Sequence, residues 1–307
     1  MSEIDLLRRA FLGAGLSLGS FLTSRTLFGD EPASREELKE PLLRVTRKND
    51  PPIEKNSQPH PLDEAIAIAN GALDRIRTEI KDYKCLLVKR ERVGGKLLDH
   101  EYMFAKIRNR KEEEGKVITP FAIYLYFVKP EAVKGRECLY IEGENGGKMI
   151  AHEGGAAARL LPSVWLAPDG PIAMRGNLYP ITEAGIENLI VKLIERGDRD
   201  RKRDECKLEF RENAKINGRA CRIMEVVHPT RRAYFDFNLA QIYIDKEYQL
   251  PVRYAAYSWP QGQDHNPEPK PSDNELIEEY TYMKLELNPG FEAVDFDSKN
   301  PNYNFGK

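Results

Sequence analysis

The sequence is poor in the features that mark several common protein classes. Only four cysteines occur in 307 residues, which is too few for a disulfide-stabilised scaffold. They are also too scattered for a zinc site. An excess of positive charge is missing, because 47 lysine and arginine residues are balanced by 49 aspartate and glutamate residues. A protein that coats nucleic acid needs a basic surface to displace counterions from phosphates, so we expect no nucleic-acid partner.

Catalytic and metal-binding motifs are missing as well. No serine lies in a G-x-S-x-G pattern, and His152-Glu153 is followed by two glycines, so it does not begin an H-E-x-x-H helix. No two of the five histidines lie within ten residues of each other, which excludes a local metal pair, although His152 could meet His228 in the fold. We therefore predict a protein that is not an enzyme and has no cofactor; an unrecognised hydrolase is the minor alternative.

The first 29 residues carry an export pattern. Arg8 and Arg9 are followed by Phe11-Leu12, and no charged residue occurs from Ala10 to Ser24. This stretch is shorter than the roughly 20 apolar residues of a membrane-spanning helix. It resembles a twin-arginine export signal and predicts a periplasmic or cell-envelope protein. A short amphipathic or buried helix is the alternative, and an uncleaved signal would act as a membrane anchor.

A proline-rich segment separates this signal from the folded part. Residues 30–61 contain six prolines among charged and polar residues, which predicts a flexible linker. A single domain is expected over 62–307. It opens with a helix over 62–80, because apolar residues recur there at alternating spacings of four and three. A second helix is predicted over 183–196, with Gly197 ending it.

Strands make up most of the remainder. Segments 82–93 and 96–110 flank Gly94-Gly95, which predicts a hairpin. Segment 121–128 is apolar on both faces and should be covered on both sides. Further short strands, including 232–238 and 275–288, follow at near-regular spacing. The fold class predicted is α+β, with an antiparallel sheet of about ten or eleven strands.

Two further patterns have a structural and a functional interpretation. Cys206 and Cys221 lie on consecutive predicted strands, but the turn between them puts Cys206 opposite about residue 225, so they should not pair. The sequence does not decide whether Cys85 and Cys138 form a disulfide. The alternative is that all four cysteines are small core residues. The charged run 198–207 is interpreted as a solvated loop rather than a site for an anionic partner.

The C-terminal third resembles the ending of the periplasmic lipoprotein-carrier superfamily, which is the LolA/LolB-like group. The shared pattern is a strand ending in Asp245, Leu250-Pro251 opening the next strand, a tyrosine-rich strand ending in Asn288, and a closing Asp295-Phe296. More narrowly, the span from about Leu62 to Phe305 is similar to the domain-of-unknown-function family numbered 1571. Its marks are Asp82-Tyr83, Arg110, Pro120-Phe121, Tyr124, Gly135, Tyr140, Ala151-His152, Asn300-Pro301 and Tyr303-Asn304-Phe305.

The wider resemblance implies a strongly curved, unclosed antiparallel sheet with helices across its concave face. It also implies an apolar cavity suited to acyl chains. The leading hypothesis is therefore an exported protein that binds a lipid, a lipoprotein acyl chain or another apolar ligand. A structural or regulatory domain that binds a cell-envelope protein is the alternative.

Strand alternation suggests which residues line such a cavity, because only one face of each strand can be concave. The candidates form three pairs, and the two residues of each pair share one face of a predicted strand. In two of the three strands the opposite face is more polar, because it carries Asp236 or Lys284. The candidates are Leu125, Phe127, Phe235, Phe237, Met283 and Leu285. A dry core beneath the helices is the alternative. If they border a pocket, its volume should be roughly 300–1,000 Å³.

Overall fold

The computed structural model describes residues 60–155, 161–203 and 205–306. The export signal predicted over 1–29, with Arg8 and Arg9, lies outside the described residues. So does the predicted linker 30–61, except for its last two residues. Both assignments stay predictions.

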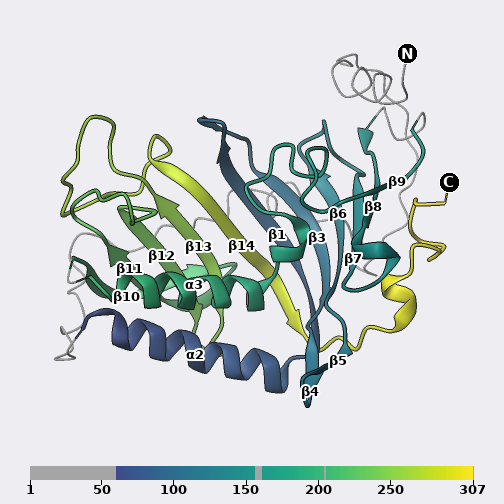
Figure 1. The fold of residues 1–307 in the computed structure, drawn as a ribbon, viewed down its shortest axis with the longest axis horizontal. Helices are drawn as coiled ribbons and strands as arrows, with labels where there is room; N and C mark the ends of the chain where they lie inside the picture. Colours follow the sequence, from purple (N-terminus) through teal and green to yellow (C-terminus); the bar gives the residue numbers. More distant parts are fainter. Residues whose placement is uncertain (1–59, 156–160, 204, 307) are drawn as a thin grey trace.

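One large antiparallel sheet organises the described residues (Figure 1). Its strand order is β10-β11-β12-β13-β14-β1-β3-β6-β7-β8-β9, with β2 pairing only to β1, and β4 and β5 form a separate hairpin. The strands are β1 (Asp82–Val93), β2 (Lys96–Leu97), β3 (Glu101–Arg108), β4 (Lys111–Glu113), β5 (Lys116–Thr119), β6 (Ala122–Lys129), β7 (Glu137–Ile141), β8 (Met149–His152), β9 (Val164–Leu166), β10 (Lys207–Ile216), β11 (Arg219–Val227), β12 (Leu239–Asp245), β13 (Pro251–Tyr257) and β14 (Leu276–Leu287). The predicted fold class and approximate strand number are confirmed.

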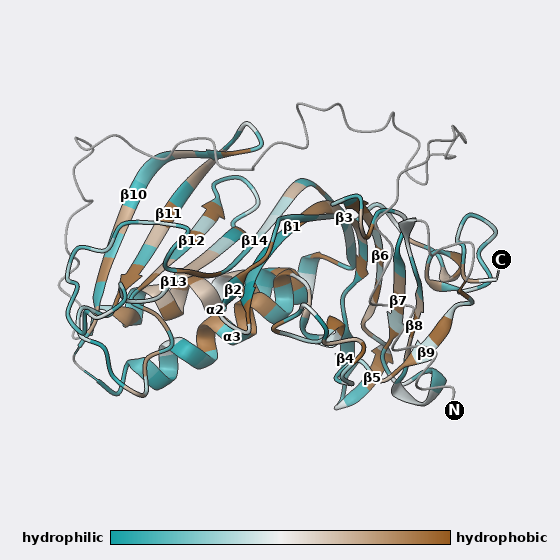
Figure 2. Ribbon diagram, turned by 90° about the horizontal axis from the view of Figure 1, so that it is seen from above, coloured by the Kyte–Doolittle hydropathy of each residue, from teal (hydrophilic) through white to brown (hydrophobic). Residues whose placement is uncertain are grey.

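The sheet is curved and leaves its concave face to the helices. Figure 2 shows it arching over helices α2 (Leu62–Glu79) and α3 (Ile186–Asp200). The buried face of α2, which includes Leu62 and Ala65, packs against sheet residues such as Phe210 and Tyr254. Its apolar spacing of three and four dictates this arrangement, because it places the apolar side chains on one side of the helix.

The opposite face of β6–β8 is covered by the C-terminal segment. Tyr303 stacks on Tyr124 with ring centroids 3.9 Å apart, and the buried Glu137 carboxylate accepts a hydrogen bond from the Asn304 backbone N–H at 3.0 Å. This explains why β6 is apolar on both faces, as predicted: the core lies on one side and the C-terminal segment on the other.

Three local predictions are wrong for identifiable reasons. Gly197 lies inside α3, where a Cβ would come within 3.0 Å of Ile66 Cγ1, so it allows close helix packing instead of ending the helix. Asp200, within the charged run expected to be a loop, is the last residue of α3 and is buried. Residues 232–238 form turns rather than a strand, because the chain there closes over His228.

All four cysteines are free thiols. Lys207 pairs with Val227 and Cys221 with Ala214, so Cys206 and Cys221 do not face each other, and the predicted mismatch of register is confirmed. Among the described residues, no helix is both long enough and apolar enough to cross a membrane.

A candidate ligand cavity on the concave face

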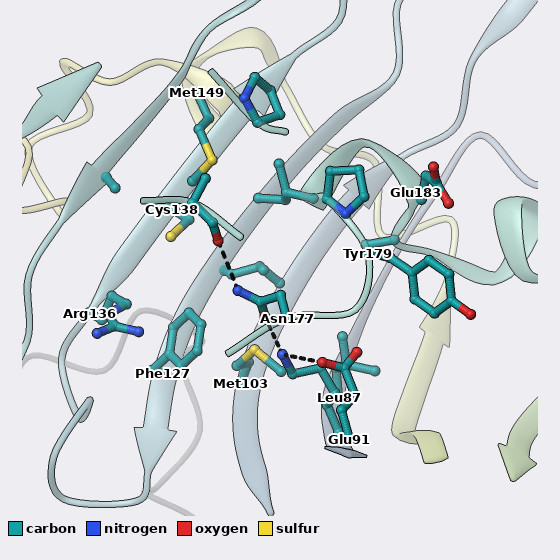
Figure 3. Close-up of a pocket in the computed structure, with 18 of the residues that line it drawn as sticks. Leu87, Glu91, Met103, Phe127, Arg136, Cys138, Met149, Asn177, Tyr179 and Glu183 are labelled. Carbon is teal, nitrogen blue, oxygen red and sulfur yellow. Dashed lines mark hydrogen bonds and ion pairs between the residues drawn. The ribbon is translucent and has the colours of Figure 1, made fainter. Parts of the chain in front are cut away.

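A cavity of about 280 Å³ lies on the concave face of the sheet. Its floor comes from β1, β3, β6, β7, β8 and β14. Its outer wall is the segment 161–185, together with the first turns of α3. Figure 3 shows the side chains that converge on it from these separate elements.

The floor of the cavity is apolar because alternate residues of each strand point inward. Leu125 and Phe127 of β6 line it, whereas Tyr124 and Tyr126, which alternate with them, pack on the opposite face in the cluster of the C-terminal segment. Neighbouring strands contribute in the same way, with Leu87, Met103, Cys138 and Met149. Burial raises the pKa of the Cys138 thiol to about 12, so this cysteine stays protonated and acts as an apolar wall residue.

One end of the cavity is polar and is built around two opposed carboxylates. Glu91 of β1 and Glu278 of β14 face each other in register, and each is only 3% exposed. The Tyr280 hydroxyl lies 2.5 Å from Glu91 Oε1 and 3.1 Å from Glu278 Oε2. Burial raises the pKa of Glu278, although Arg196 and two tyrosine hydroxyls oppose this shift.

This polar end holds the outer wall against the sheet. The Leu178 backbone N–H donates to Glu91 Oε2 at 3.1 Å, and the Asn177 side chain accepts a hydrogen bond from Lys89 (Figure 3). The Tyr179 hydroxyl donates to Glu278 at 3.3 Å and accepts from Arg196 Nη2 at 2.9 Å. The carboxylates therefore act as acceptors that position Leu178 and Tyr179, while Lys89 holds the Asn177 side chain.

A second polar group lies at the β7–β8 side. Arg136 forms an ion pair with Glu153 at 2.9 Å, and its guanidinium carbon lies 5.5 Å from the centre of the Phe127 ring. His152 lines the cavity, with Nδ1 3.1 Å from Ser163 Oγ. His228, by contrast, is fully buried outside the cavity, stacked on Phe235 and 3.5 Å from Asp200. The fold does not bring these two histidines together at the cavity.

The six residues predicted to line the cavity are not all at one place. Leu125 and Phe127 are in its wall. Phe237 packs in the cluster beneath the helices, and Phe235 stacks on His228. The last pair separates: Leu285 joins the main core, whereas Met283 packs with Leu86 and Val88 in a different cluster.

A bulge explains the separation of Met283 from Leu285. Lys284 has φ of 49°, and the register of β1 against β14 shifts at this point. The extra residue interrupts the alternation, so residues 283 and 285 point to opposite faces.

The polar residues of the site were not predicted. The alternation of side chains along the strands was a partial indication of these residues. Leu87, Lys89 and Glu91 share one face of β1, and Glu278, Tyr280 and Tyr282 share one face of β14. Asn177 and Tyr179 lie in an irregular segment where no periodicity exists, so only the fold identifies them.

Comparison with known proteins agrees with the motifs noted in the sequence. A family model described as "Protein of unknown function (DUF1571)" matches residues 80–305. A search of curated proteins gave no match.

Several solved structures are similar to this chain. One is a DUF1329 family protein from Desulfovibrio piger, with 15% identity and a TM-score of 0.36, covering 78% of this chain and 98% of that one. Another is a putative outer membrane lipoprotein-sorting protein domain from Vibrio parahaemolyticus, with 14% identity and a TM-score of 0.35, covering 77% and 97%. A third is in the MucA/MucB complex of Pseudomonas aeruginosa, with 14% identity and a TM-score of 0.37, covering 76% of this chain and 60% of that one.

Proposed function

The chain belongs to the DUF1571 family of proteins of unknown function, and we propose that it is an exported, non-enzymatic protein of the periplasm or cell envelope that binds a lipid or another apolar ligand. The observation that supports this proposal is the cavity of about 280 Å³ on the concave face, with its apolar floor. Its volume lies near the lower end of the range of small-ligand sites.

The physical driving force is the removal of apolar surface from water. Each buried methylene group contributes about 0.8 kcal/mol, so a short stretch of hydrocarbon chain is enough for useful affinity. Side chains from β3, β6 and β8 would contact such a chain, among them Met103, Leu125 and Met149. The carboxylates of Glu91 and Glu278 have a structural role, because their hydrogen bonds hold the outer wall against the sheet.

The proposed location rests on the N-terminal sequence. The Arg8-Arg9 pair and the uncharged stretch after it are the features that support export. An apolar ligand that must move through an aqueous compartment needs a protein to shield it from water, which is the task that the cavity would perform.

Filling the cavity tests this proposal. Ala151 of β8 lines the cavity, so an Ala151→Phe substitution should place a ring inside it. We expect the variant to lose binding of a neutral fluorescent probe, such as a pyrene-labelled decanoic acid methyl ester, by at least about tenfold. Circular dichroism should stay native, because the ring occupies existing space.

The matched control is Ala220→Phe. Ala220 also lies on a strand, but it is exposed and is not among the cavity-lining residues, so probe binding should be unchanged. Failure of the wild type to bind the probe would contradict the proposal. Equal binding by the two variants would place the ligand outside the cavity and would contradict it as well.

A further inference from the structure

The charges along the cavity wall are matched to one another. Five cationic side chains line the cavity, and four of them, Lys89, Arg136, Lys192 and Arg196, have a carboxylate partner. Lys89 Nζ lies 3.4 Å from Glu91 and 3.0 Å from Glu101. Arg136 lies 2.9 Å from Glu153.

The other two cations follow the same rule. Arg196 is 3.3 Å from Glu278 and 3.5 Å from Asp236, and Lys192 is 3.4 Å from Glu183. Two further polar groups of the wall are also engaged: His152 Nδ1 lies 3.1 Å from Ser163 Oγ, and Arg175, the fifth cation, is not free. Within the described residues, the wall therefore offers neither an unpaired cation for an anionic head group nor an unpaired carboxylate for a cationic one.

A charged ligand would lose its hydration in this cavity without gaining an ion pair. Burying an uncompensated charge is costly, and breaking one of the existing pairs to compensate it would leave the other member of that pair unmatched. An uncharged ligand avoids both costs and still gains the contacts with Leu125, Phe127 and Met149.

We propose that the cavity selects an uncharged acyl chain, one whose carbonyl is in an ester or amide linkage, over a free fatty acid. This inference rests on the proposed function, because it specifies the ligand of the same cavity. Arg136 with Glu153 is the pair that enforces the selection at the β7–β8 side, where Glu153 cancels a cation that would otherwise attract a carboxylate.

Three probes with the same pyrene-labelled chain test the selection: the free acid, the methyl ester and the methyl amide. At pH 8, where the free acid is ionised in water, we expect at least one neutral probe to bind the wild type about tenfold or more tighter than the acid. The neutral probe that binds more tightly identifies the preferred linkage.

A Glu153→Gln variant should weaken the selection. It removes the charge that cancels Arg136 but keeps the carbonyl oxygen that accepts from the Gly154 N–H at 3.0 Å. Binding of the acid should therefore strengthen severalfold, while binding of the ester changes little. The control is Glu131→Gln, which removes an exposed carboxylate paired with Lys134 and should alter neither affinity.

The outcomes separate the two proposals. If none of the probes binds the wild type, the proposed function itself fails. If the acid binds as tightly as the neutral probes, the cavity binds apolar chains but the selection for uncharged ones is overturned. An unchanged ratio of acid to ester affinity in Glu153→Gln would overturn the role given to the Arg136–Glu153 pair.

Discussion

Among the described residues, the largest fully buried side chain is that of Arg253 on β13. It is fully buried, and it is bonded to the Glu279 carboxylate and, at 2.9 Å, to the Thr281 hydroxyl. His100 Nε2 lies 2.7 Å from the other Glu279 oxygen. Burial alone would raise the pKa of Glu279, but the His100 hydrogen bond and the Arg253 charge outweigh it and hold the pKa at about 2.

We predict that Glu279→Gln lowers the free energy of unfolding by roughly 3 kcal/mol at pH 7, because the buried Arg253 charge loses its partner. Chemical denaturation with urea measures this directly. The control is Glu286→Gln, whose carboxylate pairs with Lys84 at the surface and is 55% exposed. It should cost less than about 1 kcal/mol.

The pH dependence follows from the lowered pKa of Glu279. The pKa of Glu279 is lower in the folded protein than in the unfolded chain, where it is about 4.5. The ionised carboxylate therefore stabilises the folded state at pH values above 4.5, and this contribution is lost as the pH falls from there toward 2. The difference in stability between the wild type and Glu279→Gln should therefore shrink between pH 5 and pH 3. A difference that stays constant over that range would show that Glu279 does not titrate in this way.

At the scale of elements, the start of α3 depends on one glycine. Gly185 has φ of 107° and precedes the first helical residue, Ile186, whose backbone N–H donates to the Tyr83 hydroxyl at 2.7 Å. A Cβ at position 185 would lie 3.0 Å from that hydroxyl oxygen. Close packing and the unusual backbone conformation therefore both favour glycine there.

Two glycine substitutions should have opposite effects. Gly185→Ala is predicted to lower the free energy of unfolding by about 1–3 kcal/mol, because it strains the backbone and crowds Tyr83. Gly71→Ala, at an exposed position within α2 with open space around it, should raise it by about 0.5–1 kcal/mol. Thermal and urea unfolding of both variants test this pair. Stabilisation by Gly185→Ala would contradict the account of how α3 begins.

Hydrophobic periodicity and turn residues made many of the helices and strands predictable. The apolar spacing of α2, the Gly94-Gly95 turn between β1 and β2, and the two-sided apolar character of β6 all reflect local rules that the fold obeys. The failures occur where tertiary contacts override those rules. Gly197 serves helix packing, and residues 232–238 turn over His228.

At the scale of the whole molecule, the fold class was predictable and the cavity was predictable only in part. Leu125 and Phe127 follow from alternation along β6. Met283 and Leu285 separate because a bulge at Lys284 interrupts the alternation, and nothing in the local sequence marks that bulge. The part of the outer wall at residues 177–179 shows no hydrophobic periodicity. Its position depends on the carboxylates of Glu91 and Glu278, which are more than 80 residues away in the chain.

The central claim is that the cavity on the concave face holds an apolar ligand in the exported protein. The most direct measurement is native mass spectrometry of the full chain purified from its own exported fraction, alongside Ala151→Phe prepared in the same way. We predict that the wild type carries an additional mass that organic solvent extracts, and that the cavity-filled variant does not. A wild type with the mass of the polypeptide alone, or the same additional mass on both proteins, would contradict the claim.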